Sequence, residues 1–208
     1  PEGADALIIA EVARARAAEG ELGGVLHIAR DDARLAALAD ALEFFAPEIE
    51  IVTLHAWDCL PYDRISPNPV LCARRMETLA LLAGPSAGGR VILTTVNAAS
   101  QRMPSRDVLR RNSFTARIGD TVNSDNLVKF LSENGYVRSS TVSEAGEFAV
   151  RGGLVDIFPA GADEPIRLDF FGDSLDGIRR FDPLSQMTTG KEQRFRLVPV
   201  SEAPLDEA

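Results

Sequence analysis

In the first half of the chain, apolar residues follow helical and extended spacing in alternation. Short apolar runs predict strands at residues 25–29, 50–54 and 90–95, and helices are predicted at residues 4–19, after Asp31 or Asp32, and at residues 71–83. The second helix shows the clearest pattern, with apolar residues at positions i, i+3, i+4 and i+7: Leu35, Leu38, Ala39, Leu42 and Phe45. Strands that alternate with helices at this spacing predict an α/β domain, a parallel sheet with helices on both faces.

After about residue 104 the pattern changes to short extended runs separated by glycine and proline. One helix is predicted at residues 125–134, with Leu127, Phe130 and Leu131 facing inward and Gly135 placed to end it. The extended runs lie at residues 136–140, 147–151, 154–158, 166–171 and 177–181. This half predicts a small, mostly antiparallel α+β domain, with the boundary near residues 104–113.

Two of the predicted strands carry an unusual outer face. Alternation places Ile166, Leu168 and Phe170 on one side of their strand and Arg167, Asp169 and Phe171 on the other. In the same way, Phe148 and Val150 lie opposite Glu147, Ala149 and Arg151. If these strands are neighbours in one sheet, Arg151, Arg167 and Phe171 share a patch of the residue types that anchor protein interfaces.

A simpler interpretation of this face stays open. Arg151 and Arg167 would then be surface charges paired with Glu147 and Asp169, and Phe171 would end its strand folded under a loop.

Charge and composition exclude several classes of protein. The 208 residues carry a net charge of −9, whereas a domain that grips DNA needs a basic stripe to neutralise phosphates. Two cysteines, Cys59 and Cys72, and two histidines lie far apart, so no catalytic triad, disulfide or metal site is predicted. No apolar run reaches the ~18 residues of a membrane span, and no signal peptide is present, so a cytoplasmic protein with no membrane contact is expected.

The residues that bind and hydrolyse a nucleotide are also absent from the sequence. The phosphate-loop pattern G-x-x-x-x-G-K-[ST] is absent, and where such a loop would lead into a helix the chain has Asp5 in place of the lysine and Ala6 in place of the hydroxyl. A carboxylate there repels a triphosphate. We therefore expect no cofactor, no ATP hydrolysis and no enzyme activity from this chain.

Several sequence blocks resemble a known family. WDCLPYD at residues 57–63, Ser66-Pro67 and Ala73-Arg74-Arg75 are similar to a stretch near the start of transcription-repair coupling factors (the Mfd family). GEFAVRGGLVDIFP at residues 146–159 resembles a block that these factors share, in looser form, with the excision-repair protein UvrB. The match continues at residues 167–171 and 181–183, and so covers nearly the whole chain.

The resemblance implies a domain organisation. Residues 1–112 would be a degenerate, incomplete RecA-like domain without a phosphate loop, and residues 113–199 an α+β module of the UvrB type that binds UvrA. Residues 200–208 would begin the return to the first domain, so the chain is expected to be an N-terminal piece of a longer protein.

The resemblance also implies a binding site. Arg151, Arg167 and Phe171 match positions that the family uses to contact UvrA, and Asp169 lies on the same strand face. Arg138 matches a UvrA-facing arginine of the UvrB module, whereas Ala149 stands where UvrB carries another arginine. The loop at residues 57–69, with Trp57, Leu60 and Tyr62, is interpreted as structural.

The function implied is recruitment of UvrA to stalled RNA polymerase in transcription-coupled nucleotide excision repair. The full-length protein would be an ATP-dependent DNA translocase of the superfamily 2 type that contacts RNA polymerase and DNA through other regions. Two alternatives stay open: a fragment that holds DNA as UvrB does, and an autoinhibitory domain that docks on other domains of its own chain.

Overall fold

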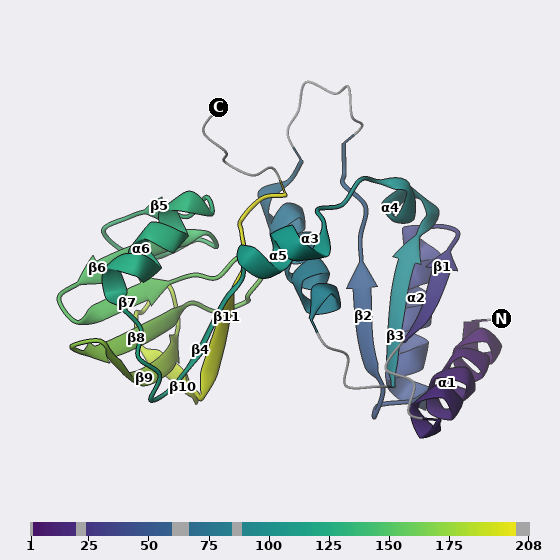
Figure 1. Cartoon of the computed structure of the whole chain (residues 1–208). Helices are drawn as coiled ribbons and strands as arrows, with labels where there is room; N and C mark the ends of the chain where they lie inside the picture. Colours follow the sequence, from purple (N-terminus) through teal and green to yellow (C-terminus); the bar gives the residue numbers. More distant parts are fainter. Residues whose placement is uncertain (1, 20–23, 60–66, 85–88, 203–208) are drawn as a thin grey trace. The chain divides into compact units, whose positions relative to one another are not determined.

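The chain forms two compact units, which are described separately here (Figure 1). The computed structural model describes residues 2–19, 24–59, 67–84 and 89–202. Unit 1 comprises Pro1–Pro67 and Leu81–Met103, and unit 2 comprises Asn68–Ala80 and Pro104–Ala208.

Unit 1 contains a three-stranded parallel sheet in the order β1-β3-β2. Its elements are α1 (Glu2–Ala18), β1 (Val25–Ala29), α2 (Asp32–Phe45), β2 (Glu50–Leu54), β3 (Arg90–Thr95) and α4 (Val96–Ser100). The side chain of Asp31 caps α2 by accepting a hydrogen bond from the Arg34 backbone N–H at 2.8 Å. The three predicted strands and the cap at Asp31 are confirmed.

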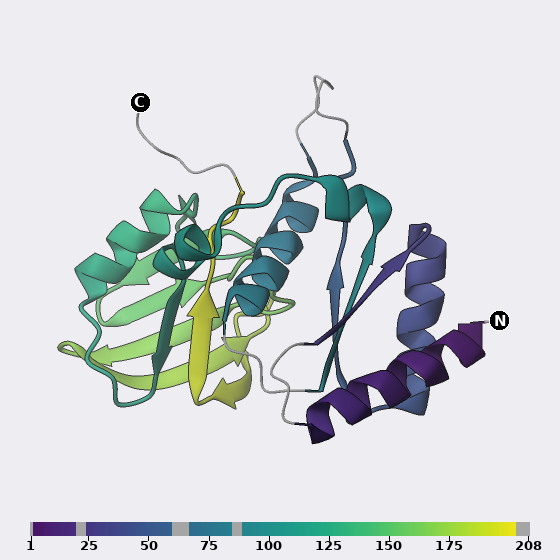
Figure 2. The ribbon, with the colours of Figure 1, turned by 45° about the vertical axis from the view of Figure 1, so that its right-hand side comes forward.

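Both long helices of unit 1 contribute to one apolar cluster with one face of the sheet (Figure 2). The cluster joins Ala6, Ile9, Ala10 and Ala13 of α1 to Leu35, Leu38 and Leu42 of α2 and to Val91 and Leu93 of β3. On the other face, Leu26 and Ile28 of β1 are exposed, so helices do not cover both faces along this strand. Phe45 is also exposed, and its predicted place in the buried stripe is wrong because the stripe of α2 ends at Leu42.

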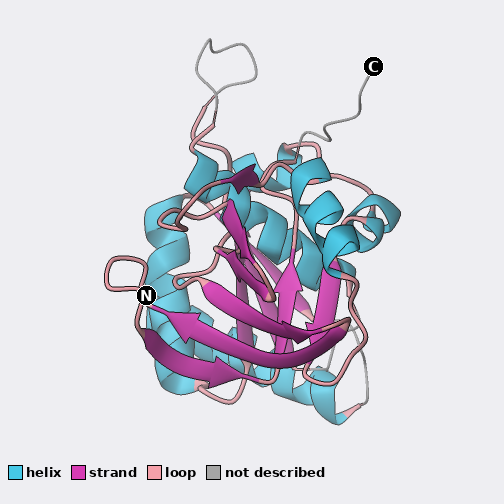
Figure 3. Ribbon diagram, turned by 90° about the vertical axis from the view of Figure 1, so that its left-hand side faces the viewer, coloured by secondary structure: helices cyan, strands magenta, loops and turns pink. Residues whose placement is uncertain are grey.

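Unit 2 is built on a six-stranded sheet in the order β10-β9-β8-β7-β6-β5 (Figure 3). Its pairs are antiparallel except β5 with β6, as expected for a mostly antiparallel α+β domain. The elements are α5 (Arg106–Arg111), β4 (Phe114–Arg117), α6 (Ser124–Glu133), β5 (Val137–Arg138), β6 (Glu147–Arg151), β7 (Leu154–Ile157), β8 (Ile166–Phe171), β9 (Ser174–Phe181), β10 (Thr188–Glu192) and β11 (Arg194–Leu197). Strands β4 and β11 form a separate antiparallel pair.

The sequence pattern did not predict α5, β4, β10 and β11. Strands β4 and β11 have only four residues each, and β10 (TTGKE) lacks any large apolar residue. Strands β4 and β11 pair with each other although they are distant in sequence, and a local pattern does not register such a pairing.

Helix α3 (Pro69–Ala83) was predicted within the first domain, but its residues up to Ala80 belong to unit 2. Arg75 of α3 forms a buried ion pair with Glu202, with 2.5 Å between Nε and Oε1. Gly161, at φ +81°, lies against the same helix, where an added Cβ would come within 2.6 Å of Glu77 Oε2. Of residues 200–208, Val200 and Glu202 also bond within unit 2, and residues 203–208 lie outside the described part of the chain.

The hydroxyl of Tyr136 is a buried junction in unit 2. It donates to the Val198 carbonyl at 3.0 Å and accepts from the Ala160 N–H at 3.1 Å, so it joins three segments that are distant in sequence. Burial raises the pKa of Tyr136 to about 12.

Replacing Tyr136 by Phe is expected to lower the free energy of unfolding by about 1–3 kcal/mol at pH 8, because two buried backbone groups lose their partner. The difference from the unaltered protein should shrink from pH 10 to pH 12. The unfolded-state phenol ionises from about pH 10 whereas the folded one resists until about pH 12, so the contribution of Tyr136 is present below pH 10 and lost as pH rises. Urea unfolding at pH 8, 10 and 11.5 measures both effects, and equal stabilities at pH 8 would contradict the assignment.

Candidate functional site

Strand register places the predicted site residues of β6 and β8 on one face of the six-stranded sheet. Arg167 pairs with Asp156 and with Arg179 across its two neighbouring strands, Asp169 pairs with Leu154, and Leu154 pairs with Arg151. Since paired residues share a face, Arg151, Arg167, Asp169 and Phe171 lie on the same side of the sheet. The opposite face carries the core residues Val155, Ile157, Ile166, Leu168 and Ile178. We call the first side the charged face and define it by Arg151, Asp156, Arg167, Asp169, Phe171 and Arg179.

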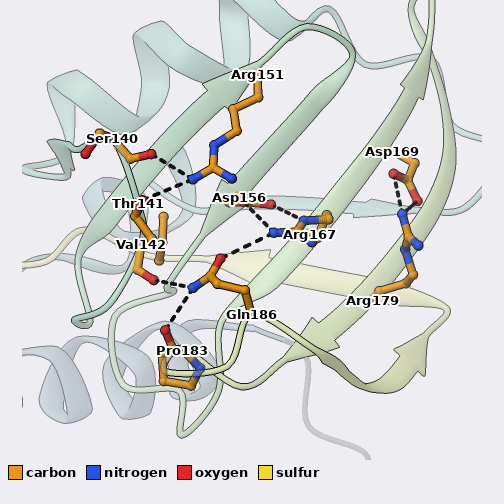
Figure 4. Close-up of polar contacts among 10 residues, drawn as sticks. All are labelled: Ser140, Thr141, Val142, Arg151, Asp156, Arg167, Asp169, Arg179, Pro183 and Gln186. Atoms are coloured by element: carbon orange, nitrogen blue, oxygen red, sulfur yellow. Dashed lines mark hydrogen bonds and ion pairs between the residues drawn. The ribbon is translucent and has the colours of Figure 1, made fainter.

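Arg167 contacts the side chains of Asp156, Gln186 and Phe181, and Figure 4 shows its bonds to the first two. Its Nε and Nη2 donate to the two carboxylate oxygens of Asp156 at 2.6 and 2.8 Å, and Asp156 is only 2% exposed. The guanidinium carbon lies 4.7 Å from the centre of the Phe181 ring. The bond to Asp156 raises the pKa of Arg167 above its ordinary value. The pairing of Arg167 with Asp169 that the simpler interpretation assumed does not form, because the register sets Asp156 opposite Arg167.

Asp169 instead pairs with Arg179 of the neighbouring strand, with 2.6 Å between Oδ2 and Nη2. Both side chains are partly exposed, at 28% and 38%. Water therefore screens this pair, unlike the buried pair of Asp156 and Arg167.

Arg151 supports the loop that follows β5. Its Nη2 donates to the Ser140 carbonyl at 2.7 Å and to Thr141 Oγ1 at 3.3 Å. Glu147 does not pair with Arg151; it accepts hydrogen bonds from the backbone N–H groups of Ser143 and Glu144, which lower its pKa. The arginine nevertheless remains exposed, so it fixes a loop and presents charge at the same time.

Phe171 is the last residue of β8, and its side chain is 81% exposed. The turn continues through Gly172 at φ +60°, a conformation that glycine adopts without strain. The alternative in which Phe171 folds under a loop is therefore wrong. A phenyl ring exposed to this extent contributes little to the core of its own chain.

Arg138 is separated from the other predicted residues. Strand β5 is only two residues long and pairs in parallel with β6, with Arg138 beside Phe148. Phe148 belongs to the core side of β6, so the register directs Arg138 away from the charged face. A role for Arg138 in binding stays a prediction without geometric support from this face.

Three contacts of the charged face were missed from the sequence: Asp156, Phe181 and Gln186. Asp156 had a signal, since it is a carboxylate inside the apolar run LVDIF. Its partner, however, depends on the register of β7 with β8, and the Gln186 contact depends on a loop conformation.

A cavity of about 390 Å³ elsewhere in unit 2 does not coincide with the charged face. Arg180 in its lining is already paired with Glu164 at 3.0 Å and with Glu192 at 2.9 Å. Acidic and basic side chains both line its wall, which gives no single charge for a ligand to match.

In unit 1, the carboxylate that was predicted to stand in place of a phosphate-loop lysine has a structural partner. Asp5 forms an ion pair with Arg34, which joins α1 to α2. Within residues 2–19, 24–59, 67–84 and 89–202, no group of three or more metal-ligating side chains could hold a metal ion. None of the helices in these ranges is long and apolar enough to cross a membrane.

The loop at residues 57–69 is only partly described. The Trp57 N–H donates to Gln101 Oε1 at 3.0 Å, whereas Leu60 and Tyr62 lie outside the described residues. The structural role predicted for those two side chains therefore stays a prediction.

Replacing Asp5 by Lys is expected to lower the free energy of unfolding by about 1 kcal/mol, because an ion pair becomes a repulsion with Arg34. Asp40→Lys is the matched control, since Asp40 is an exposed carboxylate of α2 without an ion-pair partner in the described part of the chain. Thermal unfolding of both variants measures the difference, and an equal effect of the two changes would refute a structural role for Asp5.

Replacing Arg167 by Ala is expected to cost about 3 kcal/mol of unfolding free energy, because it leaves the buried Asp156 carboxylate without its partner. Arg179→Ala should cost no more than about 1 kcal/mol, since water can solvate Asp169 in its place. Denaturant titrations of the two variants test this order, and a reversed order would disprove it. The loss also makes Arg167→Ala a poor variant for binding experiments.

Comparison with known proteins identifies the module that carries the charged face. Residues 114–202 match the family model of the UvrB interaction domain. The chain is 35% identical to the transcription-repair-coupling factor of Escherichia coli K12 over 203 residues, 98% of this chain and 17% of that protein. The corresponding factors of Haemophilus influenzae (32% identity, 99% of this chain, 17% of that protein) and Myxococcus xanthus (34%, 86% and 15%) are also similar. The chain thus spans about a sixth of the length of these relatives. It belongs to the transcription-repair-coupling-factor family, as a region that carries a UvrB interaction domain.

Proposed function

We propose that the charged face of unit 2 docks the excision-repair protein UvrA, and that the chain thereby recruits UvrA to stalled RNA polymerase in transcription-coupled nucleotide excision repair. One observation carries this proposal. Arg151, Arg167, Asp169 and Phe171 share one sheet face within the UvrB interaction domain, and Phe171 is 81% exposed there.

The side chains of this face suit a protein partner. An exposed aromatic ring on the same sheet face as two arginines provides the residue types that anchor protein interfaces. Phe171 would fill an apolar pocket of UvrA, and the exposed guanidinium of Arg151 would pair with a carboxylate at the rim.

Arg167 would act mainly by its fixed position. The side chain bonds to Asp156, lies against Phe181 and is only 18% exposed, so its position is set before a partner binds. A side chain that is already ordered loses little entropy when a partner binds, which favours association.

Unit 1 supports the proposal because the position of its expected phosphate-loop lysine is taken by a carboxylate that pairs within the unit. We propose that it is a degenerate RecA-like domain, since three parallel strands with helices remain while Asp5 is occupied by Arg34. ATP-driven translocation on DNA, and contacts with RNA polymerase and DNA, would then belong to other regions of the longer protein. The setting of such an activity would be the cytoplasm.

Titration calorimetry of the chain with purified UvrA tests this proposal. Phe171→Ala and Arg151→Ala should each weaken binding at least tenfold, which corresponds to about 1.4 kcal/mol. Lys129→Ala is the control, because Lys129 is an exposed cation of α6 rather than of the charged face, and its affinity should be unchanged.

Either of two results would overturn the proposal. One is that the unaltered chain does not bind UvrA, and the other is that the Phe171, Arg151 and Lys129 variants all bind as tightly as the unaltered chain. Salt-dependent binding of a DNA duplex without UvrA binding would favour the DNA-holding alternative instead.

A further inference from the structure

Three of the four most exposed large apolar side chains in the described residues lie at the two ends of β9. Leu184 is 91% exposed, Phe171 81%, and Met187 70%; the fourth, Phe44 at 79%, belongs to unit 1. Phe171 precedes the β8–β9 turn, and Leu184 and Met187 lie in the connection of residues 182–187 between β9 and β10. Single exposed apolar residues are ordinary, but three of them on the two connections that flank one strand indicate an interface.

The 182–187 loop is closed by its own hydrogen bonds. Asp182 Oδ1 accepts from the backbone N–H of Ser185 at 2.6 Å and from its hydroxyl at 2.7 Å, which lowers the pKa of Asp182. The Asp182 N–H donates to the Met187 carbonyl at 2.9 Å, and the Gln186 N–H donates to the Asp182 carbonyl at 2.8 Å. The loop therefore has a defined shape, although Leu184 at its tip packs against almost nothing.

Gln186 fastens this loop to the charged face (Figure 4). Its Nε2 donates to the carbonyls of Pro183 at 2.8 Å and Val142 at 3.2 Å, and its Oε1 accepts from Arg167 Nη2 at 3.5 Å. Its backbone is left-handed, at φ 60°, which is uncommon for a residue other than glycine. The local strain is tolerated because the side chain bonds on three sides.

The spacing of the two exposed ends fits a protein interface. Strand β9 has eight residues, so its ends lie about 25 Å apart at ~3.3 Å per residue. A standard interface covers about 800 Å² on each partner, a patch roughly 30 Å across. Phe171 and the 182–187 loop therefore bracket an area of this size, with Arg167 between them.

We propose that the 182–187 loop is a second apolar anchor of the UvrA-docking surface, in which Leu184 and Met187 enter apolar pockets of the same partner that receives Phe171. This inference rests on the proposed function. It extends the docking surface to a loop that contains none of the residues implied by the resemblance to UvrB. Hydrogen bonds already hold the loop closed, so its anchors cost little ordering entropy on binding.

The test is binding of the whole chain to purified UvrA by surface plasmon resonance, with Leu184→Ser and Met187→Ser combined in one variant. The dissociation constant should rise at least tenfold, mostly through faster dissociation. Ile8→Ser is the matched control, because Ile8 is an exposed apolar residue of α1 in unit 1, and its affinity should stay unchanged. Since Leu184 and Met187 are almost free of packing, the thermal unfolding midpoint of the double variant should match that of the unaltered chain.

The outcomes separate this inference from the proposed function. If the double variant binds as tightly as the unaltered chain while Phe171→Ala weakens binding, the second anchor is refuted and the docking function stands. If Ile8→Ser weakens binding as much as the double variant, the effect is not local to the loop and the inference falls. If the unaltered chain does not bind UvrA, the docking function and the anchor fall together.

Discussion

The charged face depends on one buried ion pair, between Asp156 of β7 and Arg167 of β8. A carboxylate that is 2% exposed is strongly destabilising without a partner, and the two parallel hydrogen bonds from Arg167 meet that need. The pair also fixes register. A slip of one residue between these strands would separate the two charges and turn the apolar face of β8 towards water.

The same ion pair also positions the loops around the charged face. With Arg167 fixed above Phe181, Gln186 can bond to it and to the Val142 carbonyl, and this draws two loops onto the sheet. Arg151 and Glu147 hold the loop after β5 by bonds of their own. The polar side chains are thus largely engaged within the module, while Phe171, Leu184 and Met187 remain exposed. This division of roles is expected of a preorganised protein-binding surface: polar groups hold its shape, and apolar side chains remain for the partner.

In unit 1, an ion pair joins the first two helices, and both helices share one apolar cluster with β3. Asp5 of α1 pairs with Arg34 of α2. The apolar cluster of α1, α2 and β3 supplies a core on one side of the sheet. The stability of this unit therefore depends on the packing of apolar side chains together with an ion pair between its first two helices.

The sequence by itself determined the order of most helices and strands and the face of the sheet on which each strand residue lies. Period-two alternation identified Ile166 and Leu168 as core and set Arg167, Asp169 and Phe171 on the other side, because side-chain direction in a strand follows from the backbone alone. The sequence blocks also identified the family. The tertiary structure decided which charges meet. Arg167 pairs with Asp156 rather than Asp169, Arg138 leaves the charged face, and residues 69–80 of α3 belong to unit 2. Each of these outcomes depends on the register or packing of segments distant in sequence, and local spacing carries no information about which distant segments become neighbours.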